Sequence, residues 1–260
     1  MKKSYSCINT YKCAVSQTLA SFGNIQLVAN VVISRFMKGV FNLRPPLPRY
    51  QYTCDLSKVL HYLSNLFPLE NLSLKSLTLK IAALMALCSA QRTQALVNLS
   101  IDNMSFDTDS VSFLITSLMK TAKPGQVTQT VIFKKYDKQE LCPVFTLKRY
   151  LKVTENHRKA KNLLISFKTF KKVSTSTLAR WLKNVLLLSG IDADQFKAHS
   201  FRGASTSAAF MSGVTLNDIM RTANWKSAKT FQKYYLRETE KENIHDHTSS
   251  FINTVLSSNK

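Results

Sequence analysis

Most of the chain repeats its apolar residues at the three- and four-residue spacing of an amphipathic helix. The first two segments with this pattern are residues 4–23 and 25–41, and Gly23 ends the first of them. Such spacing gathers apolar side chains on one helical face, so the pattern predicts two helices. Two helices bury too little apolar surface to form a core of their own.

A proline-rich segment, LRPPLPRY at residues 43–50, separates these helices from the rest of the chain. Proline fixes its own φ and disfavours helix in the residue before it, so an extended connection is expected here. We take this connection as a domain boundary. The expected organisation is a partial N-terminal helical segment at 1–46, a main domain at 47–240 and a polar C-terminal tail at 241–260.

Two further helices are predicted after the prolines. Residues 55–67 are amphipathic, whereas residues 73–90 are almost wholly apolar. A helix that is apolar all round is buried on every side, so we expect the second to be the central helix of the core. Arg92 follows it where the chain becomes polar. An arginine there either caps the last carbonyls of the helix or is held rigidly as an anion ligand.

The pattern then changes to the two-residue alternation of strands and includes a Lys-Pro-Gly turn. Lys120 lies just before the expected hairpin tip at residues 121–126, and Lys123 lies within it. Helical spacing resumes at 144–154 and 174–189. The chain is therefore expected to be mainly α with a small antiparallel β-sheet, an α+β fold, whose strands are residues 103–106, 110–118 and 128–133.

The C-terminal part of the main domain concentrates residues that suit chemistry on an anion. His199 and Arg202 stand three residues apart on the expected opening turn of a helix, so their side chains point to one face. Trp225 follows, and then the adjacent phenols Tyr234 and Tyr235 among lysines and arginines. Positive charge favours the phenolate, which is a nucleophile. Alternatively, the histidine is a helix-start residue and the tyrosines only pack.

Composition narrows the class of partner. The 260 residues include 36 Lys and Arg but 15 Asp and Glu, a formal net charge of +21. A protein this basic is drawn to polyanions, nucleic acid first and an anionic membrane second. The five cysteines are scattered without the spacing of a metal site, which favours reduced thiols inside a cell. We expect no signal peptide, and no window has the apolar length of a membrane span.

The ordered set of polar residues resembles that of the tyrosine recombinase, or phage-integrase-like, family. That family's catalytic set is Arg, Lys, His-x-x-Arg, His or Trp, and Tyr, and the similarity extends over about residues 50–240. Residues 4–46 resemble the last helices of the family's core-binding domain. The segments LTLKIAALMALCSAQR, HSFRGASTSAA and TFQKYYLRE are most similar to recombinases of eukaryotic mobile elements of the DIRS or Crypton kind, which implies a nuclear location.

The resemblance implies a mechanism. Two guanidiniums would clamp the non-bridging oxygens of a DNA phosphate, and a tyrosine would attack the phosphorus to form a 3′-phosphotyrosyl link. A lysine would protonate the departing 5′-oxygen, and a histidine would assist the nucleophile. No metal or nucleotide cofactor is required, and the partner is double-stranded DNA, bound by a homo-tetramer. The implied set is Arg92, Lys120 (alternatively Lys123), His199, Arg202, Trp225 and Tyr235 (alternatively Tyr234).

Some positions depart from the family's pattern. Gln94 and Ala95 stand where an acidic residue usually follows the first arginine, and Asn224 replaces the glycine that commonly precedes the Trp or His. The N-terminal helices are also fewer than a full DNA clamp would need. Two alternatives to a strand-exchange enzyme therefore remain: a catalytically silent DNA-binding protein derived from a mobile-element recombinase, and a type IB topoisomerase.

Overall fold

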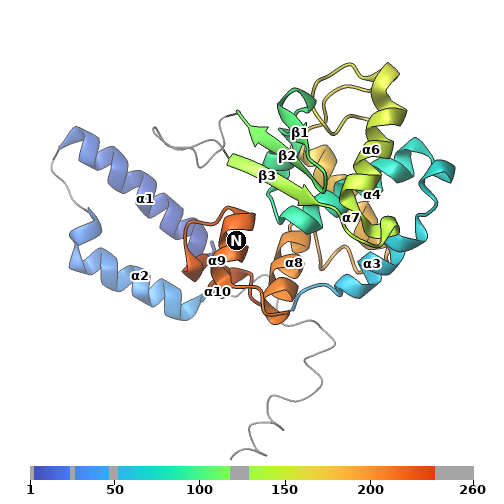
Figure 1. Cartoon of the computed structure of the whole chain (residues 1–260). Coiled ribbons are helices and arrows are strands. Elements are labelled where there is room, and N and C mark those ends of the chain that lie inside the picture. Colours follow the sequence, from blue (N-terminus) through green and yellow to red (C-terminus); the bar gives the residue numbers. More distant parts are fainter. Residues whose placement is uncertain (1–2, 24–26, 47–51, 118–128, 238–260) are drawn as a thin grey trace, which may run out of the picture. The chain divides into compact units, whose positions relative to one another are not determined.

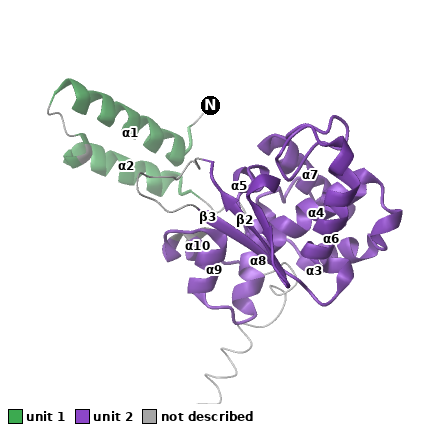
Figure 2. Cartoon of the chain, turned by 45° about the horizontal axis from the view of Figure 1, so that its top comes forward, with its two compact units in different colours: residues 1–49 green, residues 50–260 purple. Residues whose placement is uncertain are grey.

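The computed structural model describes residues 3–23, 27–46, 52–117 and 129–237 (Figure 1). The chain forms two compact units, Met1–Arg49 and Tyr50–Lys260 (Figure 2). The expected fold class is confirmed, since the described residues form mainly helices with a small antiparallel sheet. Within the described ranges, none of the helices combines the length and the apolarity needed to cross a membrane.

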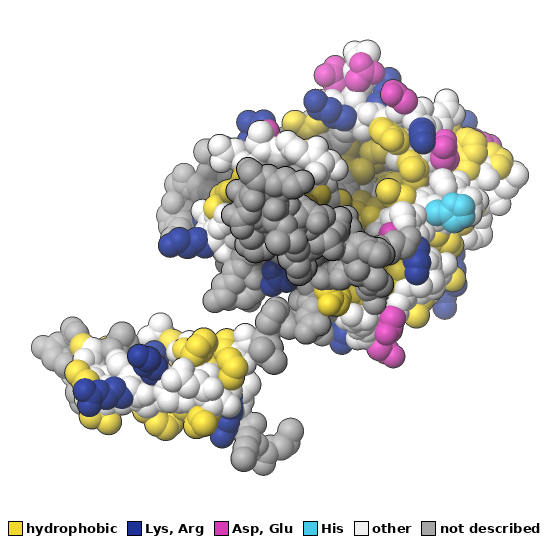
Figure 3. Space-filling model, turned by 90° about the horizontal axis from the view of Figure 1, so that it is seen from below, with side chains coloured by type: hydrophobic (Ala, Val, Ile, Leu, Met, Phe, Trp, Pro, Cys, Tyr) yellow, Lys and Arg dark blue, Asp and Glu magenta, His cyan; other side chains and the backbone are white. Residues whose placement is uncertain are grey.

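The smaller unit is a pair of helices, α1 (Tyr5–Phe22) and α2 (Val31–Leu43). Asn30 caps α2, because its side-chain oxygen accepts the N–H groups of Val32 and Ile33. Large apolar side chains remain on the surface of this unit, where Figure 3 shows them in yellow beside Lys and Arg in dark blue. The pair therefore buries little of its apolar surface, as expected for two helices.

The larger unit is built around α4 (Leu74–Ser89), which is the central helix that the sequence predicted. Eleven of its residues are buried, including a continuous run from Leu77 to Ala86. It packs against helices from later in the chain, which cover different sides of it (Figure 1). These helices are α6 (Pro143–Thr154), α7 (Thr175–Leu188) and α8 (Ser200–Met211).

A lysine is buried in this apolar helix. Lys80 has no exposed surface, and its Nζ donates a 2.6 Å hydrogen bond to the carbonyl of Leu66, just after α3 (Leu56–Asn65). The same amine lies 5.8 Å from the centre of the Phe67 ring. Burial lowers the pKa of Lys80 to about 8, although the nearby Glu140 raises it. The amine thus joins the end of α3 to α4 at the cost of a desolvated charge.

The sheet contains β1 (Met104–Phe106), β2 (Ser110–Ile115) and β3 (Gln129–Lys134), antiparallel and in that order. Every second residue of β2 is buried, as the alternation predicted. The second strand ends at Ile115, earlier than the expected residue 118, because Thr116 and Ser117 leave the ladder. The expected hairpin tip at 121–126, together with Lys120, lies outside the described residues.

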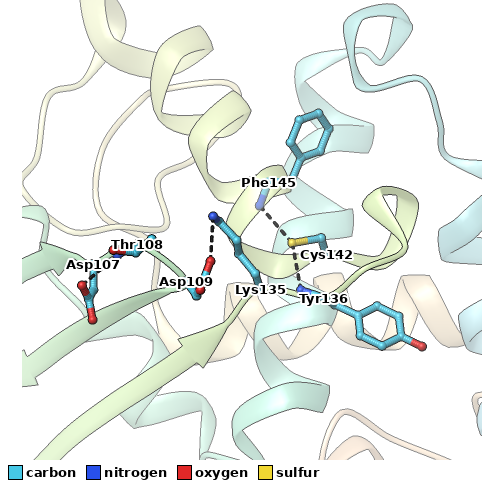
Figure 4. A network of polar contacts seen from close by, with 7 residues as sticks. All are labelled: Asp107, Thr108, Asp109, Lys135, Tyr136, Cys142 and Phe145. Atoms are coloured by element: carbon cyan, nitrogen blue, oxygen red, sulfur yellow. Dashed lines mark hydrogen bonds and ion pairs between the residues drawn. The ribbon is translucent and has the colours of Figure 1, made fainter.

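Figure 4 shows how the other end of the β2–β3 pair is joined to α6. The Nζ of Lys135 lies 3.0 Å from a carboxylate oxygen of Asp109, across the two strands. The sulfur of Cys142 accepts the backbone N–H groups of Tyr136 and Phe145, each at 3.4 Å. Cys142 therefore caps α6 and holds the segment that leaves β3, which fixes the sheet against the helical core.

Three shorter helices complete the larger unit. They are α5 (Thr93–Val97), α9 (Leu216–Ala223) and α10 (Ala228–Tyr234), and the sequence pattern did not predict α5 or α10. A helix of five or seven residues contains too few turns for its apolar period to be recognised. Both of these helices begin close to candidate catalytic residues.

Candidate active site

The opening turn of α8 carries the first two site residues. Lys197 and Ser200 form a reciprocal turn, in which the N–H of Ser200 donates to the Lys197 carbonyl and the N–H of Lys197 donates to the Ser200 hydroxyl. His199 is the residue at the N-cap, and Arg202 lies three residues further on, as the spacing predicted. The helix begins at Ser200, so both side chains start from one turn.

The guanidinium of Arg202 is the buried centre of the site. Only 2% of the residue is exposed. One of its nitrogens, Nη2, donates a 2.7 Å hydrogen bond to the carbonyl of Ala223, at the end of α9. Its carbon Cζ lies 4.5 Å from the ring centre of Trp225 and 5.7 Å from that of Tyr235. The arginine is thus packed against two aromatic faces, an arrangement that favours a cation.

The guanidinium of Arg202 does not use all of its hydrogen-bond donors. Its Nε and Nη1 are buried, and neither has a hydrogen-bond partner among the described residues. Burial lowers the pKa of Arg202 to about 10; the phenol of Tyr235 raises it, and the positive charge of Arg92 lowers it. Burying a cation whose donors have no partners costs free energy unless an anion binds to it. The site therefore has the chemistry of an incomplete anion-binding site.

Tyr235 and His199 meet beside this guanidinium. The phenolic oxygen of Tyr235 lies 2.7 Å from Nε2 of His199, and their ring centres are 5.4 Å apart. The Tyr235 ring also lies 4.5 Å from the ring of Trp225. A phenol within hydrogen-bond reach of an imidazole has the geometry of a nucleophile beside a proton acceptor.

The backbone of Tyr235 is attached to α8 by Ser207, whose role the sequence analysis did not foresee. The buried Ser207 hydroxyl donates to the carbonyl of Tyr235 at 2.5 Å and accepts the N–H of Arg237 at 3.2 Å. This serine lies in a run of small helix residues, and no local pattern in the sequence distinguishes it. One side chain thus holds the segment after α10 on the helix that carries Arg202.

Arg92 lies between α4 and α5. It is the N-cap residue of α5, and it is exposed and close enough for its charge to lower the pKa of Arg202. The last turn of α4 is closed by the backbone of Ala90, whose N–H bonds the Ala86 carbonyl at 3.1 Å in a left-handed C-cap. Since Ala90 supplies this cap, the geometry favours the second interpretation of Arg92, that of an anion ligand.

Trp225 belongs to a small apolar cluster beneath the site, which also contains Ala90, Ile219, Ala223 and Phe231. Its indole N–H is buried and has no hydrogen-bond partner among the residues described. The larger unit therefore brings His199, Arg202, Trp225 and Tyr235 into contact, with Arg92 nearby. The candidate lysines, Lys120 and Lys123, and the side chain of Tyr234 lie outside the described part of the structure.

Comparison with known protein families shows the family to which this chain belongs. Residues 55–242 match the phage integrase family, the tyrosine recombinases. Because this match covers most of the 260 residues, the chain belongs to that family. No curated protein matches the sequence.

Solved recombinase structures share the fold at low identity. A lambda integrase dimer bound to a COC′ core site is 13% identical, with a TM-score of 0.56 over 92% of this chain and 61% of that one. The Tn1549 transposon integrase in complex with circular intermediate DNA is 10% identical, with a TM-score of 0.60 over 93% and 78%. The XerH site-specific recombinase in a post-cleavage complex is 15% identical, with a TM-score of 0.54 over 70% and 48%. The chain thus spans about half the length of XerH.

Proposed function

We propose that this protein is a DNA strand-exchange enzyme that acts through a covalent 3′-phosphotyrosyl intermediate. The observation that carries the proposal is the buried Arg202 guanidinium, which has two unused donor nitrogens and lies against a tyrosine hydrogen-bonded to His199. A phosphodiester is the anion that suits these donors, because a guanidinium binds two of its oxygens at once. Membership of the phage integrase family supports this choice of substrate.

The proposed step is an in-line displacement at phosphorus. Arg92 and Arg202 bind the non-bridging oxygens, whose negative charge grows in the transition state. The phenolic oxygen of Tyr235 forms a bond to phosphorus while its proton passes to Nε2 of His199, and the bond from phosphorus to the 5′-oxygen breaks. Lys120, or alternatively Lys123, supplies the proton that the leaving 5′-oxygen needs. The indole N–H of Trp225 is a further donor at the site.

This step requires the site to open. The free nitrogens of Arg202 are buried in the described conformation, so a phosphate reaches them only after the side chains that cover them move. Tyr235 is one of those neighbours, since its ring lies over the guanidinium. We infer that DNA displaces the ring while the Ser207 contacts keep the segment attached to α8.

Tyr235 is proposed as the nucleophile in preference to Tyr234. Its hydroxyl is bonded to His199, and its backbone is anchored beside Arg202 through Ser207. All of these groups come from one chain, so the geometry supports cleavage by a tyrosine in the same subunit as its activating residues. Tyr234 remains the alternative, and its substitution is the matched control.

Double-stranded DNA is the proposed partner, and charge supports it. Residues 1–49 contain seven Lys and Arg and no Asp or Glu. We propose that this segment belongs to a core-binding domain and that the protein assembles as a tetramer on DNA; dimers and tetramers appear among the lambda integrase structures on DNA. Origin from a eukaryotic mobile element, and the nuclear location this implies, stay predictions.

The decisive experiment traps the covalent adduct. A pool of nicked duplexes with randomised sequence around the nick is incubated with the wild type, Tyr235→Phe and Tyr234→Phe, and adducts are resolved on denaturing gels. We expect adduct from the wild type and Tyr234→Phe, and none from Tyr235→Phe. If Tyr234→Phe alone fails to form the adduct, Tyr234 and not Tyr235 is the nucleophile. DNA binding without any adduct would identify a silent DNA-binding protein, and plasmid relaxation without strand exchange would identify a topoisomerase.

A further inference from the structure

The C-terminal end of α9 is joined to three distant segments by hydrogen bonds of 2.7 Å each. Nε2 of Gln91 donates to the carbonyl of Thr222, and Nη2 of Arg202 donates to the carbonyl of Ala223. Nδ2 of Asn224 donates to Oε1 of Gln129. The partners are separated by 131, 21 and 95 residues along the chain.

Each of these segments adjoins a residue of the proposed site. Gln91 immediately precedes Arg92, and Asn224 immediately precedes Trp225. Gln129 is the first residue of β3 and pairs with Ile115, the last residue of β2, so it lies at the end of the β2–β3 pair where the two strands are connected. The three bonds therefore converge within three consecutive residues, and they connect both arginines, the tryptophan and the hairpin.

The end of a helix is suited to this role. The last four carbonyls of an α-helix have no partner within the helix, so those of Thr222 and Ala223 are available to side chains from elsewhere. Asn224 ends α9 in the left-handed conformation, with φ 51° and ψ 54°. Asparagine adopts this conformation more readily than most residues. Glycine would adopt it as well, but it would lack the amide that reaches Gln129.

We propose that Gln91, Asn224 and Gln129 are positioning residues, and that the end of α9 holds Arg92, Arg202, Trp225 and the start of β3 at the spacing which phosphoryl transfer requires. The inference rests on the proposed function. Two guanidiniums clamp one phosphate only if their separation is fixed, and an error of about 1 Å in such a site costs roughly 100-fold in rate. Loss of one bond should therefore slow the chemical step more than it weakens DNA binding.

The test uses three single variants, Asn224→Gly, Gln129→Ala and Gln91→Met, and the double variant Asn224→Gly with Gln129→Ala. Glycine at position 224 keeps the left-handed backbone and removes only the amide. The control is Asn103→Ala, which removes the 3.2 Å hydrogen bond from Asn103 to Thr116 beside the same sheet. We expect adduct formation in a single turnover to be about 10- to 100-fold slower in the three single variants. DNA affinity should stay within about two-fold, and the control should match the wild type.

The double variant distinguishes positioning from general damage. If Asn224 and Gln129 act through one bond, Asn224→Gly with Gln129→Ala should be no slower than the slower single variant. Wild-type rates in the single variants, or a double variant whose defect is the product of both single defects, would overturn the proposal. An equal loss of rate in Asn103→Ala would also overturn it.

A second readout does not depend on catalysis. The chain contains two tryptophans, so in a Trp181→Phe background the fluorescence reports Trp225 alone. We expect acrylamide to quench Trp225 more strongly in Asn224→Gly and in Gln129→Ala, but not in Asn103→Ala. If the wild type forms no adduct, the proposed function fails, and this measurement still decides the inference: unchanged quenching in both variants would refute it.

Discussion

Arg202 and Arg158 differ in how many of their guanidinium nitrogens donate hydrogen bonds. All three nitrogens of Arg158 donate hydrogen bonds: Nε to the hydroxyl of Thr154, and Nη1 and Nη2 to the carbonyls of Asn162 and Leu163. Arg202 leaves Nε and Nη1 without partners among the described residues. A folded chain gains little stability from a half-satisfied buried cation, and the proposed binding of a phosphate would supply the missing partners.

This contrast gives a pair of opposite predictions. Arg202→Met should slow adduct formation by more than about 100-fold but cost less stability than Arg158→Met, because it removes a single hydrogen bond, to the Ala223 carbonyl, together with a desolvated cation. Arg158→Met leaves buried carbonyls without donors and should lower the free energy of unfolding by about 2–4 kcal/mol. Thermal unfolding and adduct assays on both variants test this. A marked loss of stability in Arg202→Met would show that its guanidinium is structural.

Ser207 is the other residue whose role can be isolated. Ser207→Ala removes both the donor to the Tyr235 carbonyl and the acceptor for the Arg237 N–H, so the tyrosine should be held less firmly. We expect adduct formation to fall about 10-fold with little change in DNA affinity. Ser205→Ala is the matched control, because its hydroxyl donates to the Arg202 carbonyl at 3.3 Å, within α8, and to no other described residue. Equal effects of the two substitutions would contradict the prediction.

At the scale of elements, long periodic segments could be predicted and contacts between segments could not. The run from Leu77 to Ala86 predicts a buried helix by itself, and the alternation in β2 predicts which side chains face the core. The order of motifs proposed His199, Arg202 and Trp225 as candidates, and the structure places them close together around Tyr235. The motifs left Tyr234 and Tyr235 open, and the bond of Tyr235 to a histidine 36 residues away could not be foreseen from the local sequence. Likewise, no pattern in the sequence around Gln91 or Ser207 indicates the hydrogen bonds that these side chains make.

The buried lysine of α4 predicts a pH dependence of stability. Lys80 has a pKa of about 8 in the folded state, below its ordinary value of 10.5, so the unfolded state binds more protons between these values. Stability should therefore rise as pH increases from about 8 to 10.5, by about 2–3 kcal/mol. Urea unfolding of the wild type and Lys80→Met over this range isolates the effect. The difference between the two proteins should change with pH, and a constant difference would contradict the argument.

At the scale of the molecule, the charge of +21 makes salt dependence the most direct test of the DNA interface. Each lysine or arginine that contacts a phosphate releases counterions and adds about one to the steepness with which log affinity falls against log salt. Arg35 and Lys38 are exposed on α2, in the segment that has no acidic residue. If both contact DNA, Arg35→Gln with Lys38→Gln should reduce the slope by about two.

A substitution at a lysine that is already paired distinguishes a loss of DNA contact from a general effect of net charge. Lys135 is already paired with Asp109, so Lys135→Gln should leave the slope nearly unchanged. Fluorescence titrations with a fixed duplex at several salt concentrations give all the slopes. If all these substitutions lower the slope in proportion to the charge removed, the attraction to DNA is a general effect of charge and α2 does not contact the DNA backbone. If the wild-type affinity does not fall with salt, the basic surface serves something other than DNA.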